Sequence, residues 1–334
     1  MPTFANDING NTPLFYIPIT LSSNSGLGFQ QQIVMNSSTY TPYLASNLSN
    51  LNFQDGSGNI ISSWLESGEL NTSTATYYWV VLPNATITVI YAVFYSTTAI
   101  SKDNITTGCE PNYSATYAQY DNGSHVFSVY DNFAGTTLSS IWNTVGVASV
   151  VVNDILSFTS AGAFQSAITT NTSYSLPICI DCLTYGSGTG ITTGLTYLTV
   201  SSAGAQNGYI GAYDTNAGGA SEPSAIVDFV GGSRNTLAFS TTSYSDTTPV
   251  LLTLSISSTN DISIVRNYNT TNISIIDSTF TSEPIGITAY YNDKTTDVMW
   301  FRARTYIATM PTQTFGSISG IGIINIQTSV NYCY

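Results

Sequence analysis

The first hundred residues consist of short runs rich in Val, Ile, Thr and Tyr that alternate with polar turns. Such runs are typical of half-buried strands, and no amphipathic helix pattern lies between them. We expect strands at 14–21, 29–35, 60–66, 75–82 and 86–95, and a short helical turn within 40–48. The segment DGSGN at 55–59 is a strong turn signal. This pattern predicts a small antiparallel β-sandwich at 13–98, preceded by an arm or linker at 1–12.

The stretch 125–158 divides the chain and opens a second series of strands. We expect a strand at 126–130 followed by a turn at 131–135, with Trp142 and the apolar run 145–152 buried. Further strands are expected at 163–169, 194–200, 208–213, 225–230, 236–240, 250–257, 261–268, 274–276 and 285–290. The series predicts a second, larger sandwich at 125–318.

The last expected strand of this sandwich is 297–308 (DVMWFRARTYIA). Because side chains alternate along a strand, one face would carry Met299, Phe301 and Ala303. The other face would carry Trp300, Arg302 and Arg304. Residues 99–124 are polar and are expected to form a linker and connecting loops. The β-prone segment 319–334 would pair within its own domain or add a strand to the sheet edge of another subunit.

Charge limits the classes of partner. The chain of 334 residues has a formal net charge of −13, with only six Lys and Arg residues. Nucleic-acid binding needs a basic surface, and docking on anionic lipid needs basic clusters, so we expect neither. Hydroxyl and amide groups must supply the solvated surface. Because the carboxylates lose their charge in acid and few basic residues remain, the chain would suit an acidic exterior.

Targeting signals are expected to be absent. The start, MPTFANDINGNTPLF, lacks the basic and apolar regions of a signal peptide, and no apolar run is long enough to span a bilayer. We therefore expect no membrane insertion. The expected location is extracellular or on a virion surface, reached by assembly or as a mature chain.

The four cysteines favour disulfides, because an even number in an extracellular-type chain fits pairing. They are Cys109, Cys179, Cys182 and Cys333. Three pairings are open, and the CxxC at 179–182 is interpreted as a staple in a loop. A zinc site would need more ligands, and the chain has one histidine, His125.

Several short motifs resemble known families. The first domain is similar to an extracellular β domain of unknown function found in archaeal and bacterial surface proteins. It matches at Leu51, Phe53, Asp55 and Gly58, at Trp64 and Glu66, and at Trp79, Val80 and Pro83. It departs where Phe94-Tyr95-Ser96 replaces Tyr-Tyr-Gly. The order from Val126 to Trp142, followed by 151–158, resembles the entry of concanavalin A-like jelly rolls. The resemblance implies a lectin-like second domain.

Catalytic residues are not expected. Concanavalin A-like glycosidases carry two Glu residues on one strand, whereas the second domain has only Glu222 and Glu283, far apart in sequence. The pair Glu66 and Glu69 lies beside a turn of the first domain. His125 has no nucleophile motif nearby. We expect no cofactor. Calcium would find oxygen ligands at Asp121, Asn122, Asp131 and Asn132, or at Asp214 and Asn216, although Asx turns explain these residues better.

Glycosylation is the expected modification. Ten Asn-X-Ser/Thr sequons occur, at Asn36, Asn47, Asn71, Asn84, Asn104, Asn112, Asn122, Asn171, Asn269 and Asn272. Glycans on them would explain solubility without charge.

These features favour a non-enzymatic structural or adhesion protein of an archaeal virion surface, in a tail, fibre or spike. Its expected partners are host surface glycans or glycoproteins, and it would act as a homo-oligomer or within a larger assembly. One alternative is a subunit of an archaeal cell-surface filament assembled by strand exchange. The other is a secreted glycan-active enzyme.

Overall fold

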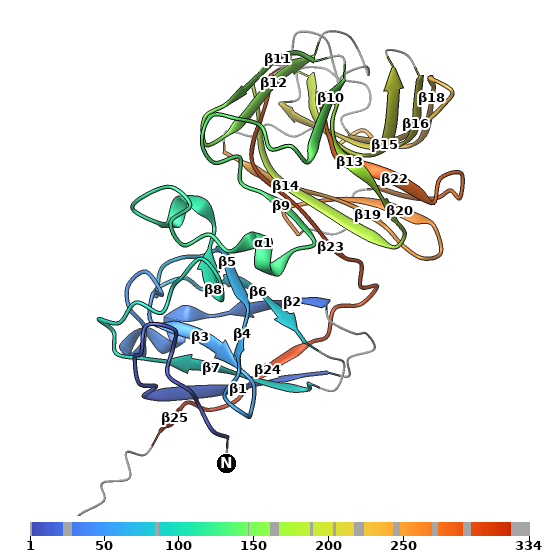
Figure 1. Cartoon of the computed structure of the whole chain (residues 1–334). Coiled ribbons are helices and arrows are strands. Elements are labelled where there is room, and N and C mark those ends of the chain that lie inside the picture. Colours follow the sequence, from blue (N-terminus) through green and yellow to red (C-terminus); the bar gives the residue numbers. More distant parts are fainter. Residues whose placement is uncertain are drawn as a thin grey trace, which may run out of the picture. The chain divides into compact units, whose positions relative to one another are not determined.

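The chain is almost entirely β-structure, which confirms the predicted fold class (Figure 1). The computed structural model describes residues 2–22, 29–83, 87–145, 147–160, 167–187, 190–202, 205–216, 224–242, 248–268, 273–289 and 295–321. The chain divides into two units. Domain 1 comprises Met1–Ser114, Gln119–Asn122 and Met310–Tyr334, and domain 2 comprises Ala115–Ala118 and Gly123–Thr309.

Domain 1 is a two-sheet sandwich. Its six-stranded sheet has the order β24-β1-β7-β3-β4, with β25 also paired to β1, and its four-stranded sheet has the order β2-β6-β5-β8. The strands of the first sheet are β1 (Phe15–Leu21), β3 (Leu51–Gln54), β4 (Ile60–Ile61), β7 (Val89–Phe94), β24 (Gln313–Phe315) and β25 (Ser319–Gly320). Those of the second are β2 (Phe29–Met35), β5 (Ser63–Ser67), β6 (Thr76–Leu82) and β8 (Thr107–Cys109). The 3-10 helix η1 (Ser37–Tyr43) lies between β2 and β3, and a second one, η2 (Pro111–Tyr113), follows β8. β5 and β8 pair in parallel.

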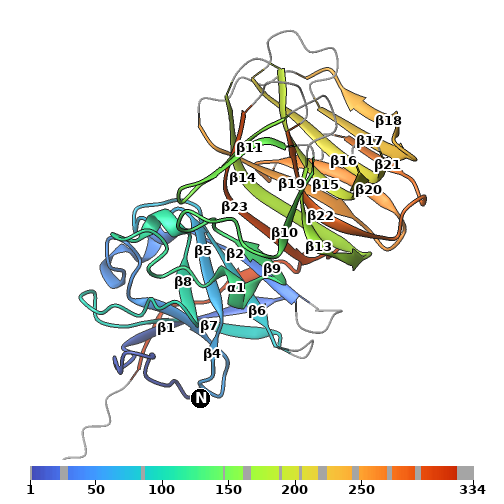
Figure 2. The same ribbon diagram turned by 45° about the horizontal axis from the view of Figure 1, so that its top comes forward.

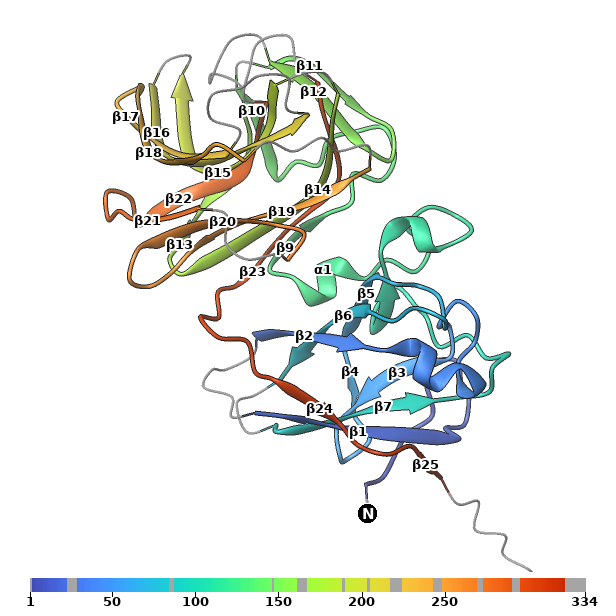
Figure 3. The same cartoon turned by 180° about the vertical axis from the view of Figure 1, so that it is seen from behind.

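The segment after domain 2 returns to complete domain 1. β24 and β25 both pair antiparallel with β1, as Figure 3 shows. Gln313 also bridges to the other sheet, because its side-chain amide accepts from Val34 N–H at 3.2 Å and donates to the Val34 carbonyl at 3.2 Å. Domain 2 therefore ends at Thr309 rather than at the expected residue 318, and it is inserted in the chain of domain 1.

The first residues of the chain are part of domain 1 and do not form a free arm or linker. Thr3 N–H bonds to the Gly56 carbonyl at 3.2 Å, and Ala5 N–H bonds to Gln54 Oε1 at 3.0 Å. Gln54 Nε2 in turn donates to the hydroxyl of the buried Tyr95 at 2.9 Å. A side-chain network that satisfies buried polar groups fixes this segment in one position.

Domain 2 is the larger sandwich. Its seven-stranded sheet has the order β10-β13-β22-β15-β16-β17-β18, and its eight-stranded sheet has the order β11-β12-β23-β14-β19-β20-β21, with β9 paired to β23 (Figure 2). The first comprises β10 (Trp142–Val145), β13 (Ala167–Ser175), β22 (Ser282–Ala289), β15 (Gly190–Ser202), β16 (Ala205–Asn216), β17 (Ser224–Val230) and β18 (Ser233–Ser240). The second comprises β11 (Val147–Val152), β12 (Leu156–Ser160), β23 (Thr295–Thr305), β14 (Ile178–Ser187), β19 (Val250–Ile256), β20 (Asp261–Arg266), β21 (Ile273–Ile276) and β9 (Val129–Asp131).

The core of domain 2 lies between these sheets, and alternate residues of each strand fill it. On β23, Phe301 and Ala303 enter the core while Arg302 lies on the opposite face, as the alternation predicted. The prediction for Met299 is wrong. The register shifts there by one residue, so that Val298 takes the core position. A bulge of this kind reverses the side-chain alternation beyond it.

The CxxC segment is a strand instead of a stapled loop. β14 pairs with both β19 and β23, which makes it an inner strand of its sheet. Residues three apart in a strand point to opposite faces, so Cys182 enters the core and Cys179 lies on the other side. Cys109, Cys179 and Cys182 are free, buried thiols, and burial raises their pKa values. Cys333 lies outside the described residues.

The segment at 126–130 also differs from the expected strand. Residues Gly123–Val126 form a single helical turn, α1, and only Val129–Asp131 forms a strand, β9. Ser128 N–H and Oγ both donate to the Ala303 carbonyl, at 3.1 and 2.9 Å, and this anchors the turn to β23.

Candidate functional site

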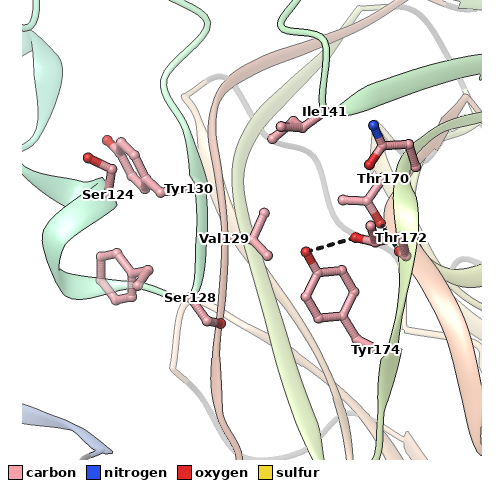
Figure 4. A pocket seen from close by; sticks show the side chains of 10 residues that line it. Ser124, Ser128, Val129, Tyr130, Ile141, Thr170, Thr172 and Tyr174 are labelled. Atoms are coloured by element: carbon pink, nitrogen blue, oxygen red, sulfur yellow. Dashed lines mark hydrogen bonds between the residues drawn. The ribbon is translucent and has the colours of Figure 1, made fainter.

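A hollow of about 350 Å³ in domain 2 is the candidate binding site, and we call it the β13 pocket. Its volume lies in the range of small-ligand sites. Its described lining is Ser124, Phe127, Ser128, Val129, Tyr130, Ile141, Thr170, Asn171, Thr172 and Tyr174. In Figure 4, Ser124 and Tyr130 form one side, Thr170, Thr172 and Tyr174 the other, and Val129 lies between them. The lining therefore combines hydroxyl groups, an amide and aromatic rings.

A bulge in β13 shapes one wall. Pairing with β22 is interrupted between Thr169 and Ser173, so residues 170–172 oppose Ile285 alone. The adjoining Pro284 has no N–H for the ladder. In the gap, Thr170 Oγ1 accepts the Ile285 N–H at 3.1 Å, so a side chain replaces the missing ladder bond. Bulges redirect side chains at the rims of sheets, and around this one Asn171, Thr172 and Tyr174 line the pocket.

The side chains on the bulge are held in place. Thr172 Oγ1 donates to the Tyr174 hydroxyl at 3.3 Å, and Asn171 Nδ2 donates to the Ser140 carbonyl at 3.0 Å. Tyr197 is fully buried behind the wall and donates its hydroxyl to the Tyr174 carbonyl at 2.8 Å. Tyr174 is half-buried, while Asn171 and Thr172 are exposed. The pocket thus has an anchored ring beside a polar rim.

The opposite wall depends on close packing around α1. A Cβ at Gly123 would overlap the ring of Tyr130, so a side chain there would displace this ring from the wall. The rings of Phe127 and Tyr130 stack with centroids 6.0 Å apart, and the guanidinium of Arg302 lies 4.7 Å from the Phe127 centroid. A cation over an aromatic face is attractive. The charge of Arg302 is therefore engaged beneath this wall and does not line the pocket.

The residues considered for calcium are used in turns or lie apart. Asp131 accepts Trp142 Nε1–H at 2.6 Å and Phe133 N–H at 2.7 Å, and Asn132 Oδ1 accepts Ala134 N–H at 3.0 Å. Burial raises the pKa of Asp131 despite these bonds. In domain 1, Asp121 accepts Trp64 Nε1–H at 2.9 Å, and Asn122 is buried. The side chains of Asp214 and Asn216 are not among those described.

No metal centre forms within the part of the chain that the structure describes, where His, Cys, Asp and Glu do not cluster in threes. The predicted carboxylate positions are also separate. Glu66 accepts Trp79 Nε1–H at 2.7 Å in domain 1, and Glu283 lies half-buried on β22. Glu222 falls outside the described residues, and His125 is exposed on α1.

A buried ionic cluster lies on the face of β14 and β23 that points away from the core. Asp181 Oδ2 accepts Arg302 Nε–H at 2.8 Å and Arg304 Nε–H at 2.9 Å, and Asp181 Oδ1 accepts Thr253 Oγ1–H at 2.7 Å. Burial would raise the pKa of Asp181, but the two guanidinium groups and these hydrogen bonds hold it at about 2. Arg302 Nη2 also donates to the Tyr268 hydroxyl at 2.9 Å. Because Asp181 is fully buried and its carboxylate is engaged by these groups, we assign the cluster a structural role.

The sequons differ in accessibility. Five asparagines are exposed: Asn36, Asn47, Asn104, Asn112 and Asn171. Asn71 is half-buried, and Asn84, Asn269 and Asn272 lie outside the described residues. Asn122 is fully buried, and its side chain packs so tightly on Gly108 that a Cβ there would overlap it. Asn122 therefore cannot carry a glycan in this fold, which corrects its prediction.

Sequence patterns did not single out the β13 pocket. Of its lining, only Asn171 was a candidate, and as a sequon. The available signal was the polar run Thr169–Ser173, which separates the apolar Ile168 from Tyr174 and breaks the period of two where the bulge lies. Its partner across the pocket, residues 123–130, could not be identified without the fold.

Comparisons with known proteins give one relative by sequence and several by fold. No family model matches the chain. It is 36% identical over 125 residues to "Uncharacterized protein 562" of Sulfolobus islandicus rod-shaped virus 1, which is 35% of this chain and 21% of that protein. The chain thus spans about a fifth of the viral relative.

Solved structures of similar fold include a carbohydrate-binding module, CBM66 of Bacillus subtilis, with 19% identity and a TM-score of 0.38 over 49% of this chain and 94% of the module. The Emp47p carbohydrate recognition domain has 14% identity and a TM-score of 0.41, over 53% and 94%. The VIP36 exoplasmic/lumenal domain has 11% identity and a TM-score of 0.41, over 53% and 93%.

Among the described residues, no helix has the length and apolar character needed to cross a bilayer.

Proposed function

We propose that this chain is a non-enzymatic protein of an archaeal virion surface that binds host glycans through the β13 pocket. The observation that carries the proposal is the bulge in β13. It presents the half-buried ring of Tyr174 beside the hydroxyl of Thr172 and the amide of Asn171, around a hollow of about 350 Å³.

These groups suit the chemistry of a sugar. A pyranose has an apolar C–H face and an edge of hydroxyls, and an aromatic side chain offers a complementary flat, apolar surface. Hydroxyl and amide groups can each donate and accept hydrogen bonds, which matches sugar hydroxyls of either orientation. Lectin-like carbohydrate recognition therefore needs no charge at this site.

The preferred ligand class is a neutral glycan. The described lining holds no charged side chain, and the chain has a net charge of −13. An acidic sugar would thus meet repulsion at long range and no cation at contact. Glycoside hydrolysis would require two carboxyl groups at the sugar, and the described lining provides none. Binding without turnover is the activity that this lining supports.

The virion setting is supported by the sequence likeness to a protein of a rod-shaped archaeal virus. The low charge and hydroxyl-rich composition also suit an exposed particle surface. Immunogold labelling of purified virions with antibodies against this chain tests the location. Label along the shell or at the ends is expected, and absence of label from intact and disrupted particles would contradict it.

Binding is tested with the full chain on an array of neutral and acidic glycans, followed by calorimetry on the best ligand. Tyr174→Ala should weaken binding at least tenfold, or about 1.4 kcal/mol, because the stacking surface is lost. Thr172→Val should weaken it less. Phe239→Ala is the matched control, since Phe239 is an exposed aromatic of domain 2 outside the pocket.

If Tyr174→Ala and Phe239→Ala reduce the glycan affinity equally, the ligand does not bind specifically in the β13 pocket. Binding of acidic glycans alone would contradict the neutral class. Release of reducing ends from a bound polysaccharide would show that the protein is a glycan-active enzyme.

A further inference from the structure

Domain 1 contains a second hollow, of about 460 Å³, which we call the β4 groove. Its lining is mainly apolar: Asp55, Asn59, Ile60, Ile61, Ser62, Val81, Pro83 and Ile87. It lies at a corner, because the chain pairs with β3 at Ile61 and with β6 from Ser63 onward. The groove does not contain any residue of the β13 pocket, so a role for the groove is independent of glycan binding.

One wall of the groove is an open strand edge. β4 ends the path of its sheet, and β3 is its neighbour on one side. Asp55 N–H bonds to the Asn59 carbonyl at 3.0 Å, so Asp55 and Asn59 form a hydrogen-bonded pair. In an antiparallel ladder the next pair, Gln54 and Ile60, is not hydrogen-bonded, and the N–H and C=O of Ile60 therefore point away from β3. Beyond β6, Pro83 offers no N–H to reach them. An edge of this kind beside apolar side chains is a template for an added strand.

The chain itself contains a segment suited to this edge. From residue 324 onward the sequence INIQTSVNYCY alternates strictly. Apolar or β-favouring residues occupy Ile324, Ile326, Thr328, Val330, Tyr332 and Tyr334. Polar or small residues occupy the positions between them, Asn325, Gln327, Ser329, Asn331 and Cys333. This period of two predicts a strand with one face to bury.

The position of β25 indicates which copy receives the segment. β25 pairs with β1 at one edge of the sheet, and β4 forms the other edge. Four strand spacings separate them, about 19 Å. The described chain reaches Ile321, and three extended residue steps from there to Ile324 cover about 10 Å. A strand that begins at residue 324 therefore cannot reach the β4 edge of its own chain.

We infer that residues 324–334 of one copy add as a strand to β4 of a second copy, with their apolar face on Ile60, Val81 and Ile87. β25, which precedes the donor segment in the chain, and the acceptor β4 lie on opposite edges of the six-stranded sheet. The contact is thus heterologous, and repeated addition extends a head-to-tail assembly instead of closing a two-fold dimer. Donation by the same copy and pairing with an unrelated protein are the competing outcomes.

The test compares full-length chain with a chain ending at Ile321, by light scattering after size exclusion under reducing conditions. Full-length protein should form concentration-dependent multiples of 35.7 kDa, and the shortened chain should remain at one copy. Ile326→Lys should abolish assembly because it places a charge on the apolar face. Gln327→Lys is the matched control on the polar face and should assemble.

A labelled peptide of residues 322–334 with Cys333→Ser supplies a second measurement. It should bind the shortened chain, and Ile60→Lys or Ile87→Lys should weaken binding at least tenfold, while circular dichroism checks that the variants fold. A full-length chain that stays monomeric at every concentration overturns the proposal. Equal behaviour of the Ile326 and Gln327 variants, or peptide binding that both groove variants leave unchanged, also overturns it.

Discussion

Replacing Asp181 with Asn is the sharpest test of how domain 2 is held together. The change keeps the size of the side chain and removes its charge. Asp181 and Arg302 are fully buried and Arg304 is 11% exposed, so two guanidinium groups lose their counter-ion where water cannot compensate. The new Nδ2–H₂ would also face N–H donors in place of the acceptor Oδ2.

The expected loss at neutral pH is about 3–5 kcal/mol in the free energy of unfolding of domain 2, the range for breaking a buried ion pair on one side. A pH-dependent share follows from the pKa of Asp181, which folding lowers from 3.8 to about 2. That shift corresponds to about 2–3 kcal/mol. Because the folded pKa is lowered, this share is present above pH 3.8 and is lost as the pH falls through 2.

Urea unfolding at pH 7, 4 and 2 measures the effect. Trp142 and Trp300 lie in domain 2, whereas Trp64 and Trp79 lie in domain 1. In a protein that carries Trp64→Phe and Trp79→Phe, the two remaining tryptophans therefore report on domain 2 alone. Asp297→Asn is the control, because Asp297 lies half-buried on β23 and pairs with β14, the strand that carries Asp181. The free energy of unfolding of the Asp181 variant should be much lower than that of wild type at pH 7 and should approach the wild-type value at pH 2.

A difference below about 1 kcal/mol at pH 7, relative to the Asp297 control, would refute the cluster as a major source of stability. A large loss that stays constant down to pH 2 would show that packing and not charge is responsible. The expected result would also support the prediction that the chain suits an acidic exterior, because this carboxylate keeps its partners in moderately acidic solution.

Two further predictions concern domain 1. Burial raises the pKa of the Glu110 carboxyl from 4.5 to about 7, so its contribution to stability is present below pH 4.5 and is lost as the pH rises through 7. In urea unfolding, Glu110→Gln should therefore have the same free energy of unfolding as wild type near pH 4 and a free energy higher by up to about 3 kcal/mol at pH 8. A variant that is less stable than wild type at pH 8 would contradict this. Glycopeptide mass spectrometry of the native protein should find Asn122 unmodified, with occupancy confined to accessible sequons such as Asn36 and Asn104. A glycan on Asn122 would show that its segment opens before folding is complete.

The fold class and most strands could be predicted from the sequence because strand formation leaves a local signal. The run Phe29–Met35 was predicted with its observed bounds, since turns flank it and its residues favour pleated structure. The alternation on β23 placed Phe301 and Arg302 on opposite faces for the same reason. The rule failed at Met299, because the sequence around a one-residue bulge looks like regular strand.

β14 shows how a motif can mask a local signal. Ile178, Ile180 and Cys182 alternate and enter the core, and Asp181 faces the other way, so the period of a strand was present. The CxxC spacing drew attention to the sulfur atoms and away from this period. The carboxylate of Asp181, between the two cysteines, is the group that holds the buried cluster together. Its role depends on Arg302 and Arg304, which lie more than a hundred residues away in the sequence.

The sequence by itself determined most of the segments that become strands and the scarcity of basic groups. Only the tertiary structure decided that β24 and β25 complete domain 1, that Asn122 is buried, and that Tyr174 and Phe127 line one pocket. The physical reason is that strand periodicity arises from neighbouring residues. Strand order, burial and the meeting of distant side chains depend on which edges pair, and many pairings satisfy the same local pattern.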